Sequence, residues 1–205
     1  MYMTCTTGQL HIAASAARQA SDTSDVGLIR SIAAGDKHAM QILFARHNVR
    51  VFRFVLRLIG DKSAAEDLVS DVFLDVWRQA GRFQGRSQVT TWLLAIARNK
   101  ALSALRDRST EELDEDAAAA IEDPQDNPEA TLENRQKSEI VLKCLAQLSP
   151  TDREVIDLVY YHEKSIDEVA EIVGVPQNTV TTRMLYARKR IAELMSAQGI
   201  DRAIV

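Results

Sequence analysis

The sequence is poor in glycine, proline and aromatic residues. Its 205 residues include only eight Gly and four Pro, and 5% of them are aromatic. Ala, Leu, Arg and Glu are abundant instead, and these side chains lose little conformational freedom in a helix. We therefore expect an all-α protein with almost no sheet. Hydrophobic residues make up 46% of the chain, and two small cores fit this length better than one large core.

Long apolar runs are also missing. Charged residues interrupt every hydrophobic stretch well before the roughly 20 residues that a membrane-spanning helix needs. Residues 1–24 lack the early basic cluster and compact apolar segment of a secretory signal, so we expect a poorly ordered extension there. Cys5 and Cys144 lie far apart, which suits reduced thiols in a cytoplasmic protein. Cys144 has apolar neighbours and is expected to be a core residue.

Signatures of catalysis and metal binding are absent from the sequence. Its four histidines have no Cys or acid partner at ligand spacing, and the chain has no glycine-rich phosphate loop or nucleophile motif. We therefore expect no catalytic residue, no metal site and no cofactor. His47 is expected in a core or at its edge, whereas His38 and His162 are expected at the surface.

Basic residues are absent from one segment, which carries the acidity of the protein. Residues 109–134 contain ten Asp or Glu, two Pro and no Lys or Arg, whereas residues 36–108 contain thirteen Lys or Arg against seven Asp or Glu. The acidic segment has the composition of a flexible tether and lacks the ligand spacing of a calcium loop. We expect an extension at 1–24, helical domains at 25–108 and 135–197, the linker at 109–134 and a tail at 198–205.

Helix start and stop signals define four helices in the first domain. A short helix begins at Ser24, and the apolar spacing of the next stretch predicts a long helix that ends at Gly60. Ser63 with Glu66 has the pattern of a capping box for a third helix, and residues 90–108 form the fourth. The inward side of the long helix should consist of Met40, Leu43, Phe44, His47, Val51, Val55 and Leu58.

The second domain has the signals of a helix-turn-helix. Ser149 before Pro150 predicts one helix start, and Ser165 with Glu168 predicts a second helix of about nine residues. Gly and Pro within 174–176 then break the chain before a longer basic helix. Two helices of these lengths around a tight turn form the arrangement that places its second helix in a DNA groove.

A helical wheel separates two faces on the last helix. The inward face consists of Val180, Met184, Ala187 and Ile191. The outward face consists of Asn178, Thr181, Thr182, Leu185, Arg188 and Lys189. Its amide, hydroxyl, apolar and cationic groups suit the major groove, where they meet base edges, thymine methyl groups and phosphates. The alternative is a solvated surface helix whose charges only provide solubility.

A loop and helix in the first domain offer a different surface. In RFQGRSQVTTWLLAIARNK a polar loop with Phe83 and Arg86 precedes a helix that carries Trp92, Arg98 and further polar residues. Aromatic rings beside cations suit an unstacked base of single-stranded DNA. Simple core packing is the alternative for Phe83 and, with at least equal weight, for Trp92.

Five stretches occur in the order that one protein family shows. They are AEDLVSDVFLDVWR, RFQGRSQVTTWLLAIARNKALSALR, DPQDNPEA, LSPTDREVIDLVYY and IDEVAEIVGVPQNTVTTRMLYARKRI. With these stretches the chain resembles the extracytoplasmic-function (ECF) group of bacterial sigma factors, the two-domain members of the sigma-70 family. The resemblance covers roughly residues 25–195.

The resemblance implies a transcription initiation factor that binds core RNA polymerase and promoter DNA, the minus-10 element through 25–108 and the minus-35 element through 135–197. The polymerase contacts, on the clamp helices of the largest subunit, would be Asp67, Asp71, Asp75 and Arg78, and the beta-subunit flap would be a further contact. The minus-10 contacts would be Phe83, Gln84, Arg86, Ser87, Trp92, Arg98, Asn99, Lys100 and Ser103. The minus-35 contacts would be Asn178, Thr181, Thr182, Arg183, Leu185, Tyr186, Arg188 and Lys189.

Further expectations concern partners and alternatives. The family often has an anti-sigma inhibitor, so such a partner is expected here. Ser103, Thr181, Thr182 and Tyr186 differ from the family's usual residues, which bears on the promoter sequence and not on the fold. An ordinary helix-turn-helix regulator and a scaffold without DNA contact are the alternatives. The acidic linker is expected to keep the two domains mobile until polymerase holds them apart.

Overall fold

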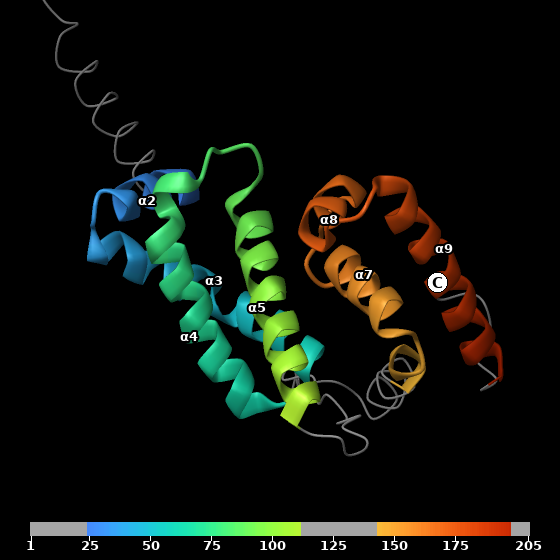
Figure 1. Ribbon diagram of the computed structural model, residues 1–205. Helices are drawn as coiled ribbons and strands as arrows, with labels where there is room; N and C mark the ends of the chain where they lie inside the picture. Colours follow the sequence, from blue (N-terminus) through green and yellow to red (C-terminus); the bar gives the residue numbers. More distant parts are fainter. Residues whose placement is uncertain (1–23, 112–142, 198–205) are drawn as a thin grey trace, which may run out of the picture.

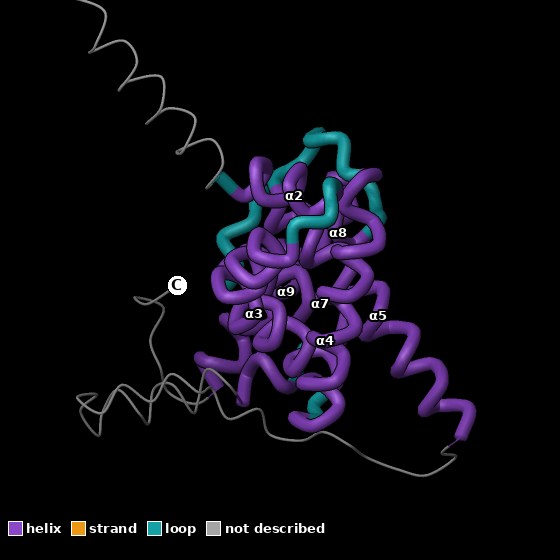
Figure 2. Tube along the Cα trace, turned by 90° about the vertical axis from the view of Figure 1, so that its left-hand side faces the viewer, coloured by secondary structure: helices purple, strands orange, loops and turns teal. Residues whose placement is uncertain are grey.

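The described part of the chain is built from helices. The computed structural model describes residues 24–111 and 143–197, and within these ranges it contains no strand (Figures 1 and 2). The all-α prediction is therefore confirmed. The expected N-terminal extension, acidic linker and C-terminal tail lie wholly or almost wholly outside the described residues. The elements are α2 (Asp25–Ala33), α3 (Lys37–Ile59), α4 (Lys62–Gln79), the 3-10 helix η1 (Ala80–Arg82), α5 (Val89–Glu111), α7 (Pro150–Tyr160), α8 (Ile166–Val173) and α9 (Gln177–Ala197).

Short polar side chains begin the first two helices. The Ser24 hydroxyl accepts a hydrogen bond from the backbone N–H of Gly27 at 3.0 Å, which caps α2 as expected. The Asp36 carboxylate caps α3 in the same way. Gly60 then ends α3 with φ of 72°, a left-handed conformation that glycine adopts without a steric penalty.

The capping box expected at Ser63 was wrong. The N-cap of α4 is Asp61, whose carboxylate accepts a hydrogen bond from the backbone N–H of Ala64 at 3.0 Å. Asp and Ser are about equally good N-caps, and Asp61 directly follows the glycine that ends α3. The helix therefore begins two residues earlier than the sequence pattern suggested.

The helix starts of the second domain are those predicted. The Ser149 hydroxyl accepts from the backbone N–H of Asp152, and Pro150 occupies the first helical position of α7. Ser165 and Glu168 form a complete capping box at α8, which is eight residues long. A left-handed Gly174 (φ 72°) ends α8 and leads into α9. The helix-turn-helix prediction is thereby confirmed in geometry.

The first domain buries one side of each helix. The inward face predicted for α3 is correct except at Phe44, which is 41% exposed and meets the Phe73 ring edge-on. Phe54, which the pattern did not select, is fully buried instead. His47 is buried and hydrogen-bonds to the Asp25 carboxylate at 2.8 Å, as suits a core-edge histidine. The largest fully buried side chains here are Ile29, Ile32, Leu43, Val51, Phe54, Val55, Val72, Val76, Leu93 and Leu94.

The second domain has its own buried residues between α7, α8 and α9. Val155, Leu158 and Val169 pack here. The predicted inward face of α9 is confirmed, since Val180, Met184 and Ala187 are buried and Ile191 is partly buried against them. Cys144 is fully buried, as predicted, and this burial raises the pKa of its thiol.

The two domains contact each other directly. Helix α5 packs along α8, and α3 meets α7, so that α5 lies between α4 on one side and the second domain on the other (Figure 1). The buried residues of both domains form one continuous cluster. The sequence did not predict this contact, because it suggested domains that move independently.

Candidate nucleic-acid interface

The outward face of α9 is open to solvent along its length. All six of its predicted members are exposed, and the Leu185 side chain is 67% exposed. The hydroxyls of Thr181 and Thr182 donate to backbone carbonyl groups one turn earlier, at 3.0 and 2.8 Å, and their oxygens can still accept hydrogen bonds. Tyr186 is 63% exposed beside them. Two large apolar side chains held out in water on a polar helix suggest a contact surface.

The cations of α9 differ in their surroundings. Arg188 lies over the Tyr160 ring, with 5.7 Å between the guanidinium carbon and the ring centroid. Arg190 instead forms an exposed ion pair with Glu193 at 3.4 Å. Lys189 is exposed and Arg183 is half-buried. The aromatic contact orients Arg188 without neutralising it, so its charge is available to a phosphate.

The predicted acids of α4 fall into two kinds. Asp67 and Asp71 are exposed, and α5 lies between their helix, α4, and the second domain (Figure 1). Asp75 is half-buried and forms ion pairs with Lys100 at 3.0 Å and with Arg78 at 3.6 Å. The ion pair between Asp75 and Lys100 therefore joins a residue predicted to bind polymerase to a residue predicted to bind the minus-10 element.

A groove lies where α4 and α5 meet. Asn99, Lys100 and Ser103, three of the predicted minus-10 residues, line it from α5. Asp75 and Gln79 line it from α4. The structure thus brings these three predicted residues together on one surface, although Lys100 is already engaged by Asp75.

The loop before α5 combines packed and exposed side chains. The rings of Phe83 and Trp92 lie 5.0 Å apart, and both are partly buried against the core. Gln84 and Arg86 are exposed, and Ser87 is half-buried. Both side chains therefore pack against the core, and neither residue is fully buried.

Arg98, one of the predicted minus-10 residues, contacts the second domain. Its guanidinium donates two hydrogen bonds to the Glu154 carboxylate of α7, from Nε to Oε1 at 2.6 Å and from Nη2 to Oε2 at 3.2 Å. Only 17% of the Arg98 side chain and 5% of the Glu154 side chain are exposed. In this arrangement Arg98 belongs to the contact between the domains and not to an open surface.

Other charged groups of the same contact escaped the sequence analysis. Arg57 of α3 pairs with Asp157 of α7 and stacks on the Tyr161 ring at 3.9 Å. His162, expected at the surface, is 4% exposed and packs edge-on against Phe54 at 5.4 Å between centroids. The prediction that His162 lies at the surface was wrong, because the sequence around it does not indicate that the first domain covers this side chain.

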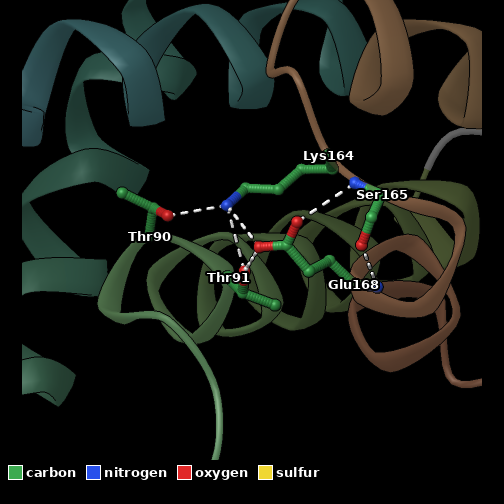
Figure 3. A network of polar contacts seen from close by, with 5 residues as sticks. All are labelled: Thr90, Thr91, Lys164, Ser165 and Glu168. Atoms are coloured by element: carbon green, nitrogen blue, oxygen red, sulfur yellow. Dashed lines mark hydrogen bonds and ion pairs between the residues drawn. The ribbon is translucent and has the colours of Figure 1, made fainter.

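A buried lysine forms the end of this contact near the start of α5. Lys164 is 5% exposed, and its ammonium donates to the hydroxyls of Thr90 and Thr91 at 2.7 and 3.0 Å and to Glu168 at 2.9 Å (Figure 3). The Thr91 hydroxyl also donates to Glu168 at 2.6 Å. The four-residue spacing of Lys164 and Glu168 was a usable signal for the pair, but not for its threonine partners.

Glu168 has an unusual ionisation. Burial by itself raises the pKa of this carboxyl, but the hydrogen bonds from Thr91, Lys164 and the Ser165 backbone, together with the Lys164 charge, outweigh it and lower the pKa to about 2. Since the ordinary value is 4.5, the unfolded chain binds this proton more tightly than the folded chain. The resulting stabilisation is present above pH 4.5 and is lost as the pH falls toward 2.

A pH titration of stability tests this ionisation. We expect the wild type to melt at a higher temperature than Glu168→Gln above pH 4.5, and the difference to narrow as the pH falls toward 2. Thermal unfolding followed by circular dichroism across this range measures both proteins. Because both proteins contain all the other carboxyls, the difference in melting temperature reports on Glu168 alone. A difference that stays constant with pH would contradict the lowered pKa of Glu168.

Comparisons with known proteins follow the same division of the chain. Residues 43–111 match the family described as Sigma-70 region 2, and residues 138–191 match the family described as Sigma-70, region 4. The chain belongs to the sigma-70 family. This sigma factor is 31% identical to the RNA polymerase sigma factor CarQ of Myxococcus xanthus, over 82% of its own length and 95% of the relative.

Two further comparisons agree. The ECF RNA polymerase sigma factor SigK of Mycobacterium sp. (strain KMS) is 29% identical, over 77% of this chain and 83% of the relative. Among solved structures, the sigma factor RpoE in complex with the anti-sigma factor NepR, from Bartonella quintana, is similar with a TM-score of 0.61 and 28% identity, over 75% of this chain and 94% of that one. The resemblance to the ECF group is confirmed.

Membership of this group decides between the functions that the sequence left open. The chain is an alternative sigma factor, which binds core RNA polymerase and promoter DNA, and the ordinary regulator is not favoured. Sigma factors are non-enzymatic transcription factors. Within residues 24–111 and 143–197, no helix is long and apolar enough to cross a membrane, and no three His, Cys, Asp or Glu side chains gather as a metal site.

Proposed function

We propose that this sigma factor divides its contacts among three surfaces. The outward face of α9 reads the minus-35 element, α5 with the loop before it binds the melted minus-10 strand, and the acidic side of α4 docks on the polymerase clamp helices. The domains that carry these surfaces are residues 25–108 and 135–197. The beta-subunit flap is a further contact of the second domain.

The observation that carries the proposal is the exposed α9 face within a sigma-70 region 4 match. Thr182 and Leu185 offer a hydroxyl and an apolar tip to base edges, while Arg188 and Arg183 offer charge to phosphates. The other members of this surface are Asn178, Thr181, Tyr186 and Lys189. Because Tyr160 stacks near Arg188, that cation is held close to the helix that enters the groove.

The minus-10 surface rests on the groove between α4 and α5 and on the preceding loop. Asn99, Lys100 and Ser103 share the groove, and the half-exposed rings of Phe83 and Trp92 offer stacking faces for an unpaired base. The exposed loop residues Gln84 and Arg86, with Ser87 and Arg98, complete this set.

The polymerase contact rests on the exposed acids of α4. Asp67 and Asp71 lie one turn apart on one side of the helix, and Asp75 and Arg78 continue that side. The chain itself carries no catalytic activity in this proposal and works in the cytoplasm. An anti-sigma factor is a further partner, supported by the similar RpoE structure, which contains NepR.

A pull-down separates this function from that of an ordinary regulator. The purified chain is expected to bind purified core RNA polymerase in the absence of DNA and to give promoter-specific transcripts with it. A regulator would bind a duplex operator without polymerase and would add nothing to transcription by core enzyme alone. Binding to duplex DNA without any binding to core polymerase would contradict the proposal.

A further inference from the structure

The outward face of α9 carries two adjacent threonines whose hydroxyl protons are already engaged. The Thr181 hydroxyl donates to the backbone carbonyl of Gln177 at 3.0 Å, and the Thr182 hydroxyl donates to that of Asn178 at 2.8 Å. Both threonines are exposed, so their oxygens remain accessible. A hydroxyl has one proton to donate and two lone pairs that accept. What each threonine still offers to DNA is therefore a hydrogen-bond acceptor.

A donor role toward DNA would bring neither threonine a gain. To donate to a base, the hydroxyl would have to leave the backbone carbonyl, so one hydrogen bond would replace another. Accepting a hydrogen bond from a base adds a bond and leaves the first one in place. A hydroxyl that already donates is also the better acceptor, because consecutive hydrogen bonds polarise one another. Thr181 and Thr182 are thus prepared to accept.

Asn178, one turn earlier on the same face, has the opposite polarity. Its side-chain oxygen Oδ1 accepts from the backbone N–H of Thr179 at 2.9 Å. Asn178 is exposed, so its two side-chain N–H groups remain accessible. Asparagine usually recognises adenine with its oxygen and its amino group together. Because Oδ1 is engaged by the backbone, Asn178 offers DNA two donors in place of that combination.

The base edges of the major groove differ in the same property. Adenine and cytosine present amino donors there, whereas guanine presents two neighbouring acceptors, its N7 and O6 atoms. A threonine oxygen that can only accept therefore selects an amino group. It rejects a carbonyl oxygen, because two acceptors that face each other have no proton between them and lose their bonds to water. The two N–H groups of Asn178 match the acceptor pair of guanine.

We infer that α9 reads the minus-35 element through hydrogen-bond polarities that its own backbone fixes. Thr181 and Thr182 each accept from the amino group of an adenine or a cytosine, and Asn178 donates to a guanine. This inference rests on the proposed assignment of α9 to the minus-35 element. It adds which base atoms are read, and it places the origin of that choice in hydrogen bonds within the first turns of the helix.

Two substitutions at Thr182 separate its hydroxyl from its shape. Thr182→Val keeps the branched shape without the hydroxyl, and Thr182→Ser keeps the hydroxyl. Thr179→Val is the matched control, since it makes the same chemical change at a half-buried position outside the predicted surface. Asn178→Ala removes the amide. Each full-length chain is combined with purified core polymerase, and this holoenzyme selects from duplex promoters that share one minus-10 element and have randomised minus-35 bases.

The selections identify the base pair that each side chain reads. Wild-type holoenzyme should enrich one minus-35 sequence, and Thr182→Val should lose the preference at one base pair of it. That preference is expected to fall from about tenfold to about twofold, since one wrong base pair costs about this much. Thr182→Ser and Thr179→Val should keep the preference. The pair at which Asn178→Ala loses the preference should be G·C.

Base analogues then show which atom is read. 2-Aminopurine pairs with thymine but lacks the major-groove amino group of adenine, and pyrimidin-2-one lacks that of cytosine. At the pair read by Thr182, the matching analogue should lower wild-type affinity about tenfold and leave the affinity of Thr182→Val unchanged. A 7-deazapurine at this pair, which lacks N7, should affect neither protein. At the pair read by Asn178, 7-deazaguanine should weaken the wild type but not Asn178→Ala.

The outcomes separate this inference from the function on which it rests. The inference is overturned if removal of the amino group leaves wild-type affinity unchanged, if the preference survives in Thr182→Val, or if it is lost in Thr182→Ser. A pair other than G·C at Asn178 overturns it as well. In all these cases a minus-35 preference of the wild type still supports the proposed function. A wild-type holoenzyme without any minus-35 preference would overturn both.

Discussion

Asp71→Arg is expected to lower the affinity for core RNA polymerase by tenfold or more. Asp71 is exposed on α4, four residues after Asp67 and four before Asp75, so the substitution places a positive charge in the middle of an acidic surface. A like charge set against a basic partner costs several kcal/mol. An exposed substitution changes the free energy of unfolding by only about 0.5 kcal/mol. Titration of labelled protein with purified core enzyme measures the affinity.

A neighbouring acid provides the control for this experiment. Glu66 is exposed on α4 and lies outside the predicted contact, so Glu66→Arg makes the same change of charge on another side of the helix. This control should bind core polymerase as tightly as the wild type does. If Asp71→Arg binds normally, or if it loses binding only because the fold collapses, the acidic side of α4 is not the docking surface.

Loss of Arg188 is expected to weaken binding of the second domain to all duplex sequences alike. A phosphate contact releases about one counterion, so Arg188→Ala should lower the slope of log affinity against log salt by about one. Arg183→Ala should act in the same way. Arg190 forms an exposed pair with Glu193 and is not part of the predicted surface, so Arg190→Ala serves as the control and should leave the slope unchanged.

Changes at the base-reading positions should act differently. Leu185→Ala or Thr182→Ala is expected to alter the ranking of minus-35 sequences by about 1 to 3 kcal/mol at one base pair, with little effect on the salt slope. Leu185 is 67% exposed, so its truncation should leave the fold intact. Binding of a set of single-base duplex variants at two salt concentrations separates the two kinds of contact. If none of the four substitutions changes binding, α9 is a solvated helix.

Local signals in the sequence predicted most of the fold. Helix caps depend on a few adjacent residues, so Ser149 with Pro150 and Ser165 with Glu168 could be read directly from the chain. The faces of α9 followed from helical spacing alone. The same local logic failed at Ser63, because two residues two positions apart could cap the helix and Asp61, directly after the end of α3, does so.

The contact between the domains could not be read in this way. Arg98 and Glu154 are 56 positions apart, and Arg57 and Asp157 are 100 positions apart, so no local pattern joins them. The only indication of this contact was electrostatic. Residues 36–108 contain more basic than acidic residues, whereas the acidic residues of the second domain concentrate in α7 and α8. His162 was misplaced for the same reason, since it meets Phe54 across the contact.

The most direct test of the account is transcription of genomic DNA by purified core RNA polymerase with this chain added, followed by mapping of the start sites. The account predicts new start sites that share two sequence elements, one near minus-10 and one near minus-35. With Leu185→Ala, the sequence preference at the minus-35 element should change while the minus-10 element stays the same. Start sites identical to those of core enzyme alone, or a shared minus-10 element with no shared minus-35 element, would contradict the account.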